Sequence, residues 1–484
     1  MEREGSMVAY QEISQSSVGR SVRVGLGKLL VAGALSLLGW EVLGPNTARA
    51  ERAQGEAWLG SYGRVGFSSD ESGGEGDRVA ITPYAPRLIE DNYLELDASY
   101  RAHQGPEATV DITTTLSLFD AFFHYDGVAD ASWAIRRAFI EARELWGGPL
   151  WLSLGSRWLR GNDIYLMNMW PLDNLNTMGL TLGARGPRYD AQLHLGVNRL
   201  NSNPLSPQVQ RVAVPSASGF GADQVLLLDR QRLIASALFE RRAAGWKWKL
   251  YGELHRLPSG ERALEGSYLE REELPDDLGL MVGAQLGLWG MWSPQDHLNL
   301  WARYAKGLAV YDELGPTGSL NLERRSWSAE EWRLALAGNL AGAKWSAQWG
   351  GYVRYFRDAD RSLDDFDDRL EGSFALRPQL NLGAFTPAME LSAQLSEALG
   401  AHPIELTRGL ATVYQLGLIP AFSFGGGAEV GSFTRPQLRL MYVLSWVNEA
   451  ARARYAPEDP QAHAALRHYL GARAEWWFGR GGGY

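Results

Sequence analysis

Aromatic and charged side chains alternate with apolar ones in the stretch from Tyr93 to Tyr100. Tyr93, Glu95 and Asp97 share one face of an extended chain, whereas the residues between them are apolar. A pyranose has an apolar face of C–H groups, which suits an aromatic ring, and a rim of hydroxyls, which suits charged hydrogen-bond partners. The polar face of this stretch therefore has the chemistry to bind a sugar.

The same arrangement recurs at three other aromatic residues. Each shares a face with charged or polar neighbours at even spacing: Tyr62 with Arg64, Phe385 with Arg377 and Gln379, and Trp477 with Glu475 and Arg473. A ring that only packs into a wall has little reason to lie on the polar side. A row of such rings could pass a sugar from one to the next, provided that each binds weakly enough to release it.

Several other kinds of chemistry lack the residues that they need. The chain has no cysteine, its eight histidines are scattered, and no G-x-S-x-G motif offers a nucleophile with a base in reach. A net charge of -9 argues against a nucleic-acid surface. The acidic run at residues 364–368 lacks the spacing and glycine of an EF-hand loop, and we interpret it as a solvated turn. We therefore predict no enzyme activity, no metal and no other cofactor.

The first 50 residues have the pattern of an export signal. Basic residues up to Lys28 precede an apolar run from Leu29 to Trp40, and an A-x-A motif follows at residues 48–50. The run is too short for a transmembrane helix, which needs about 20 residues. We predict that residues 1–50 are a cleaved signal peptide, starting at Met1 or Met7, and that residues 51–484 form a single mature domain.

Segments of alternating apolar and polar residues recur along the predicted mature chain. The clearest are residues 93–100, 298–306, 376–385, 389–396 and 435–446, separated by turns rich in Gly, Pro, Asp and Ser. Alternation is also common in soluble half-buried sheets. Here, however, long runs carry Arg, Glu and Gln on one face and Leu and aromatic residues on the other. That contrast is typical of a wall between lipid and a polar lumen.

Composition and length favour the same fold. The chain has 55 Gly, 19 Trp and 19 Tyr, as expected where aromatic girdles mark two membrane interfaces and glycines serve turns. A mature chain of this length can supply about 16 to 18 strands with some long loops. We predict an all-β, closed antiparallel transmembrane barrel around a water-filled pore, surrounded by lipid in the outer membrane of a Gram-negative bacterium.

Several segments resemble, in the same order, the maltoporin family of sugar-specific porins. Residues 60–66 are similar to the first strand of that family, residues 92–96 to its Tyr-x-Glu strand and residues 134–142 to its Phe-Arg-Glu-Ala strand. The longest similar stretch, residues 150–173, covers its Trp-x-Gly-x-Arg strand and the constriction loop that follows. Residues 377–389, 434–436 and 471–478 complete the resemblance.

The resemblance implies a homotrimer of barrels with about eighteen strands each and an inward-folded constriction loop. It also implies a ladder of aromatic residues along which maltodextrins or related oligosaccharides slide, beside a track of charged residues. By position, the ladder is Tyr62, Tyr93, Phe385 and Trp477, the polar track is Arg64, Glu95, Arg136 and Asp163, and Trp170 falls at the constriction. Asn168 and Gly161 stand where the family has aspartate and arginine, which leaves the choice of sugar open.

Other functions fit parts of the same pattern. A general or non-sugar porin would conduct ions without being blocked by sugars, an outer-membrane barrel enzyme would hydrolyse a lipid ester, and a plugged structural or adhesive barrel would not conduct. The individual residues also have structural alternatives. The aromatic rings could belong to an interface belt, Arg64, Glu95 and Arg136 could brace the wall as ion pairs, and Asp163 could anchor the inward loop.

Overall fold

The computed structural model describes residues 54–76, 78–121, 123, 130–201, 208–264, 270–315, 317–360, 367–400, 409–425 and 431–479. The predicted signal peptide at residues 1–50 lies outside the described residues, so its cleavage stays a prediction. In the described ranges, no helix has both the length and the apolar character needed to cross a membrane.

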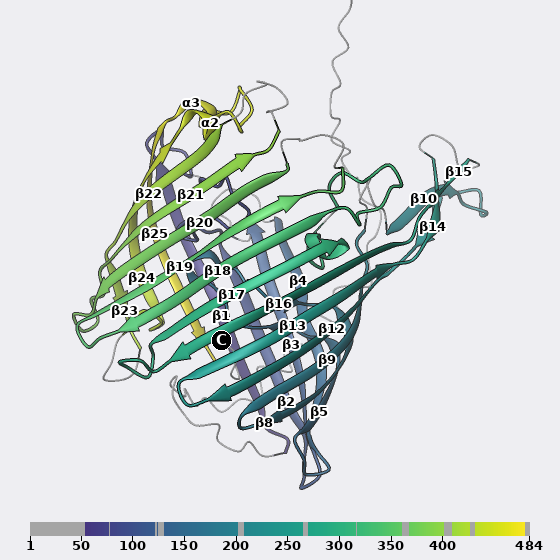
Figure 1. The fold of residues 1–484 in the computed structure, drawn as a ribbon, viewed down its shortest axis with the longest axis horizontal. Coiled ribbons are helices and arrows are strands. Elements are labelled where there is room, and N and C mark those ends of the chain that lie inside the picture. Colours follow the sequence, from purple (N-terminus) through teal and green to yellow (C-terminus); the bar gives the residue numbers. More distant parts are fainter. Residues whose placement is uncertain are drawn as a thin grey trace, which may run out of the picture. The chain divides into compact units, whose positions relative to one another are not determined.

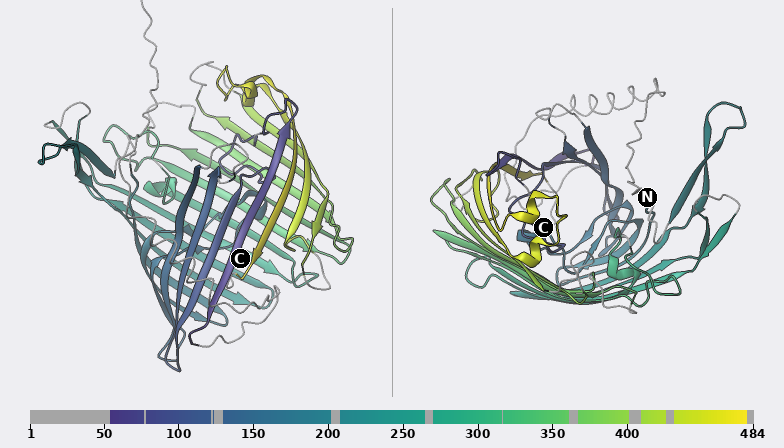
Figure 2. Two further views of the ribbon diagram at one scale, coloured as in Figure 1. Left: turned by 180° about the vertical axis from the view of Figure 1, so that it is seen from behind. Right: turned by 90° about the horizontal axis from the view of Figure 1, so that it is seen from above.

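Antiparallel strands form the wall of a closed barrel (Figure 1). Each strand pairs with the next one along the wall, and β1 closes the barrel by pairing with β25 (Figure 2). The wall strands are β1 (Ala57–Asp70), β2 (Tyr93–Gln104), β3 (Thr109–Ala121), β4 (Asp130–Leu145), β5 (Leu150–Ser156), β8 (Met178–Gly186), β9 (Tyr189–Asn198), β12 (Arg232–Ala243), β13 (Trp246–Leu257), β16 (Asp277–Trp289), β17 (His297–Gly307), β18 (Glu330–Ala341), β19 (Trp345–Arg357), β20 (Arg369–Leu380), β21 (Ala388–Ala398), β22 (Leu410–Ile419), β23 (Ala421–Ser423), β24 (Gln437–Val447) and β25 (Leu466–Phe478).

The described part of the wall contains 18 strands, although its sheet is divided into 19 segments. The difference arises because β22 and β23 both pair with β24 and are two parts of one strand, interrupted at Pro420. Proline has no N–H to donate to a sheet, which explains the interruption. The predicted fold class, a closed antiparallel barrel of about 18 strands, is therefore confirmed.

Shorter elements lie in the connections between wall strands. They are β6 (Leu159–Arg160), β7 (Asn174–Leu175), β10 (Val209–Pro215), β11 (Ala222–Asp229), β14 (Gly260–Ala263), β15 (Arg271–Leu274), the 3-10 helices η2 (Tyr165–Met167) and η3 (Leu308–Tyr311), and the helices α2 (Glu449–Arg452) and α3 (Pro460–His463). Connections at one end of the barrel are short, such as residues 187–188 and 244–245. Those at the other end include the long segments 71–92, 157–177 and 308–329.

The two faces of the wall have opposite polarity. On β24, Leu438 and Leu440 are more than half exposed on the outer face, whereas Gln437 and Arg439 are buried on the inner face. The strands β2, β17 and β21 repeat this pattern. Because a soluble protein buries its apolar residues instead, this inverted arrangement fits a wall between lipid and a polar interior.

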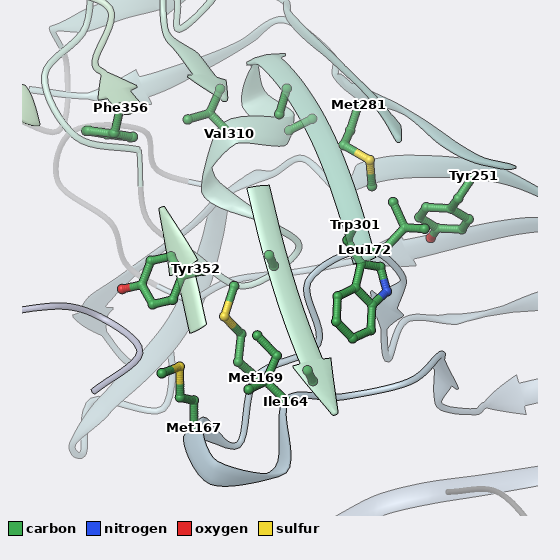
Figure 3. Packing of buried hydrophobic residues seen from close by; sticks show 14 of the residues in the cluster. Ile164, Met167, Met169, Leu172, Tyr251, Met281, Trp301, Val310, Tyr352 and Phe356 are labelled. Carbon is green, nitrogen blue, oxygen red and sulfur yellow. The ribbon is translucent and has the colours of Figure 1, made fainter. Parts of the chain in front are cut away.

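Part of the inner wall is nevertheless apolar, because a connecting segment covers it. We call residues 157–177 the constriction loop. Its Ile164 and Met169 are buried against Trp301 and Tyr352, which point inward from β17 and β19 (Figure 3). Gly350 of β19 makes room for this contact, since a Cβ atom there would lie 2.2 Å from Cγ2 of Ile164. The loop is thus fixed to the wall by apolar packing, a contact that alternation alone does not reveal.

A second inward segment, residues 78–92, lies against the inner wall at the nearby strands β21 and β22. Leu88 packs over Gly417 of β22, where a Cβ atom would come within 2.4 Å of its Cδ2. The side-chain amide of Gln394 on β21 donates to the carbonyl of Val79 and accepts from the backbone N–H of Ile81, both at 2.9 Å. The backbone N–H of Arg87 then donates to Leu166 of the constriction loop, so the two segments are joined.

Candidate functional site

Neighbouring strands at the closure of the barrel bring five predicted site residues together. In the strand register Tyr62 of β1 lies opposite Glu95 of β2 on one side and Trp477 of β25 on the other, and Arg64 lies opposite Tyr93. Directly paired residues in antiparallel strands point to the same face. The rings of Tyr62 and Tyr93 are 6.0 Å apart between centroids, at an angle of 52°.

Arg64 holds these rings and the inward segment in place. Its guanidinium lies 5.1 Å from the ring centre of Tyr93 and 5.9 Å from that of Tyr62, and it donates to the Tyr62 hydroxyl at 3.1 Å. It also forms an ion pair of 3.3 Å with Glu90. The Tyr93 hydroxyl donates to Glu95, whose carboxylate is buried in the wall. The predicted site residues on β1 and β2 are therefore in direct contact with one another.

A β-bulge in β4 directs two consecutive arginines inward. Thr115 of β3 pairs with Arg137 and the next residue pairs with Ile135, so Arg136 is the extra residue of the bulge. Arg137 forms an ion pair with Asp97 at 2.7 Å. The guanidinium of Arg136 lies 6.0 Å from the Tyr93 ring centre and 5.4 Å from that of Trp158 at the start of the constriction loop.

The constriction loop adds further contacts between guanidinium groups and aromatic rings. The guanidinium of Arg160 lies 4.4 Å from the ring centre of Trp158 and 4.3 Å from that of Trp170, and its Nε donates to Asn174 at 2.6 Å. Rings and cations thus alternate without interruption through seven residues. We call them the arginine–aromatic track: Tyr62, Arg64, Tyr93, Arg136, Trp158, Arg160 and Trp170.

Asp163 and Gly161 lie in the same loop. Burial raises the pKa of the Asp163 carboxyl to about 6, although the charges of Arg87 and Arg160 favour its ionised form. At Gly161 a Cβ atom would lie 2.1 Å from Oδ1 of Asp173, so the arginine of the maltoporin pattern does not fit there unless the Asp173 carboxylate moves. Arg160, one position earlier, places its charge on the track instead.

Tyr165 is a central residue that the sequence analysis did not single out. Its ring centre lies 5.4 Å from that of Phe433 and 6.4 Å from that of Trp477, and its hydroxyl donates to Glu475 at 3.1 Å. The guanidinium of Arg87 covers its ring at 4.6 Å. Tyr165 thus joins the constriction loop to β25 and to the connection before β24. An aromatic residue inside the loop was the only signal available in the sequence.

Glu475 forms ion pairs with three arginines around Tyr165. Its carboxylate is almost fully buried and forms ion pairs with Arg435 at 2.9 Å, Arg87 at 3.3 Å and Arg439 at 3.6 Å. Arg435 also lies 4.4 Å from the ring centre of Trp477. The predicted ladder residue Trp477 is therefore flanked by a cation, as the track residues are.

Phe385 does not join the other predicted residues. Strand β20 ends at Leu380, and a turn that includes Gly383 at a φ of +68° intervenes, so the alternation counted through residue 385 does not continue. Phe385 pairs with Phe422, and the two ring centres are 5.2 Å apart. Phe422 in turn lies opposite Leu438, which is exposed on the outer face. The structure thus places Phe385 on the apolar side of the wall.

The described residues contain no group of three or more His, Asp or Glu side chains arranged to hold a metal ion. The acidic run at 364–368 is described only at its end, where Asp368 accepts from Arg357 at 3.1 Å. The site is thus a lumen surface of rings and guanidinium groups, whose chemistry is stacking, hydrogen bonding and charge attraction.

A closed barrel with an apolar exterior and this polar, aromatic interior is an outer-membrane channel of the porin class. The chain belongs to the LamB porin family, whose pattern it matches over residues 59–478. The resemblance to maltoporin-like porins is therefore confirmed, as are the outer-membrane location and the assignment as a channel without enzyme activity.

Solved structures similar to this chain include other outer-membrane proteins at low sequence identity. OprD of Pseudomonas aeruginosa is 10% identical, with 89% of this chain and 98% of that chain covered and a TM-score of 0.42. OccD3 of Pseudomonas aeruginosa is 10% identical, with 87% and 91% covered and a TM-score of 0.43. OmpT of Vibrio cholerae is 8% identical, with 89% and 100% covered and a TM-score of 0.40. No curated protein sequence matches the chain.

Proposed function

We propose that this porin conducts oligosaccharides by passing them along the lumen faces of Tyr62, Tyr93 and Trp477. One observation supports the proposal most directly: the three rings lie on neighbouring strands at the closure of the barrel, and each has a charged group beside it. We include in the proposal the cleavage of residues 1–50, a single barrel domain formed by residues 51–484, and assembly as a homotrimer.

The arrangement suits a sugar for a physical reason. A stacked pyranose uses its C–H face on a ring, and its hydroxyl groups then lie at the ring edge. There they meet Arg64 beside Tyr93, whose guanidinium is partly exposed and is a stronger hydrogen-bond partner than a neutral group. Because the residues recur along the wall, a sugar can exchange one contact for the next and leave, as transport requires.

Planar-bilayer conductance with titrated maltohexaose tests this function. We expect the sugar to block the current in a concentration-dependent way and Tyr93→Ala to raise the half-blocking concentration about tenfold, since a stacked ring contributes up to about 1.5 kcal/mol. Tyr100→Ala is the matched control, because Tyr100 belongs to the same strand but is exposed on the outer face. It should leave the block unchanged.

Other outcomes identify the other functions. A channel that conducts ions but is blocked by no glucan or sucrose is a general or non-sugar porin. Purified protein that never conducts is a plugged barrel, and purified protein that hydrolyses a lipid ester is an enzyme. Each of these three results contradicts the proposal.

A further inference from the structure

The charge that the track and the neighbouring Arg137 present to the lumen is mainly positive. The side chains of Arg64 and Arg137 keep 15% and 20% of their surface exposed, whereas the carboxylates paired with them, Glu90 and Asp97, keep 6% and 8%. Glu95 is also buried, beneath Tyr93. The acidic partners thus lie behind the guanidinium groups, and a solute in the lumen meets the cations first.

Arg136 is the cation best prepared to bind a further group. Among the described residues it forms no ion pair, and its guanidinium faces the rings of Tyr93 and Trp158 instead. A cation over a ring face keeps its N–H groups free to donate at the edge, and the planar guanidinium fork fits a carboxylate or phosphate with two hydrogen bonds. The bulge in β4 fixes this position, because it aims Arg136 and Arg137 into the lumen together.

We propose that the arginine–aromatic track selects acidic oligosaccharides over neutral ones. A pyranose stacks on the ring of Tyr93, and an anionic substituent of the sugar, a carboxylate or a phosphate, pairs with Arg136. Trp158, whose ring Arg137 and Arg160 cover at 4.5 Å and 4.4 Å, supports the guanidinium groups. This inference rests on the proposed function as a sugar channel and names the class of sugar. The departures at Gly161 and Asn168 agree with a ligand other than maltodextrin.

The inference is tested by block of the channel with hexamers of galacturonate and, separately, with maltohexaose and glucose 6-phosphate. In about 0.1 M salt we expect the galacturonate hexamer to block at a concentration at least tenfold lower than maltohexaose does. The difference should shrink in about 1 M salt, because screening weakens charge attraction. Glucose 6-phosphate tests the phosphate group separately. If it blocks the channel more strongly than glucose and about as strongly as monomeric galacturonate, one anion site binds both groups.

Variants of Arg136 connect the effect to the site. Arg136→Gln should remove most of the advantage of the acidic hexamer, and Arg136→Lys, which keeps the charge but not the planar fork, should restore only part of it. Arg199→Gln is the matched control, since Arg199 lies in the connection between β9 and β12 and pairs with Asp229 there. It should leave the preference unchanged.

Equal or stronger block by maltohexaose would overturn the acidic-sugar inference while leaving the sugar channel intact. An advantage for the acidic hexamer that persists fully in Arg136→Gln would also overturn it, since another site would then bind the anion. Block by none of these sugars would instead contradict the proposed function itself.

Discussion

Trp476 and Trp477 are consecutive residues of β25 whose rings lie on opposite faces of the barrel wall. The ring of Trp476 covers Gly63, and its indole N–H donates to Ser61 at 3.1 Å. Trp477 lies opposite Tyr62 on the lumen face, next to the guanidinium of Arg435. One strand thus provides the same residue type in a wall-packing role and in the proposed sugar-binding role.

The pair of tryptophans gives a matched test of the ladder. We expect Trp477→Leu to weaken sugar block of the current about tenfold, because the stacking surface is lost while the residue remains apolar. Trp476→Leu should leave the block unchanged and instead lower the stability of the barrel in detergent, since its ring packs on β1. If both variants weakened the block equally, the side-chain directions would not explain the effect.

Glu475 provides a prediction about stability. Its replacement by glutamine leaves Arg87, Arg435 and Arg439 buried without their common carboxylate. Breaking a buried ion pair on one side typically costs about 3–5 kcal/mol. We expect Glu475→Gln to lower the free energy of unfolding by about 3 kcal/mol, measured by urea unfolding in detergent micelles.

The control for Glu475 is a similar ion pair that is partly exposed. Glu272 pairs with Arg262 and Arg324 between short strands outside the wall, and about a fifth of its side chain is exposed. Glu272→Gln should cost less than about 1 kcal/mol. A loss of the same size in both variants would show that burial of Glu475 is not the cause.

The sequence predicts the wall well because side-chain direction in a strand is a local property. Leu438 and Arg439 point to opposite faces whatever their neighbours are, so alternation alone predicts which one meets lipid. The same rule, together with the resemblance, places Tyr62 and Tyr93 on the lumen side. It fails for Phe385, because the turn after Leu380 ends the alternation before residue 385.

Contacts between distant segments could not be predicted in this way. Alternation gives the face of Glu475 but not its partner Arg87, which is 388 positions earlier in the chain. The position of Tyr165 likewise depends on how the constriction loop packs on the wall, which no local pattern determines. At Arg136 the family position was informative, whereas the bulge that turns two neighbouring arginines inward has no distinct signal in the sequence.

Trp170 gives a prediction about conductance. It lies on the inward constriction loop with Arg160 over its ring, and its side chain is only partly buried. We expect Trp170→Ala to raise the single-channel conductance in potassium chloride, because a bulky ring is removed from the lumen. Trp292→Ala is the control, since Trp292 is strongly exposed in the short connection between β16 and β17. An unchanged conductance in Trp170→Ala would show that Trp170 does not limit the pore.

The titration of Glu313 should make the stability depend on pH. Glu313 lies in the connection between β17 and β18 and links it to the constriction loop. Its carboxylate accepts the backbone N–H of Asn176 at 2.6 Å, and burial raises its pKa to about 7. An ordinary glutamate titrates near 4.5. The folded protein therefore retains this proton between about pH 4.5 and 7, while the unfolded chain releases it, so the free energy of unfolding falls as the pH rises through that range.

Urea unfolding in micelles at pH 5 and pH 8 measures this effect. We expect the titration of Glu313 to lower the stability at pH 8, relative to pH 5, by at most about 3 kcal/mol, and Glu313→Gln to remove this contribution. Asp163 acts in the same direction at lower pH, because its pKa is raised to about 6. Burial acts to raise the pKa of Glu90, but the charge of Arg87 and other arginines lowers it overall, so Glu90 titrates below this range.

Glu323→Gln changes a strongly exposed position of the same connection and should keep the wild-type profile. A barrel that becomes more stable between pH 5 and pH 8 would contradict the buried, protonated state of Glu313.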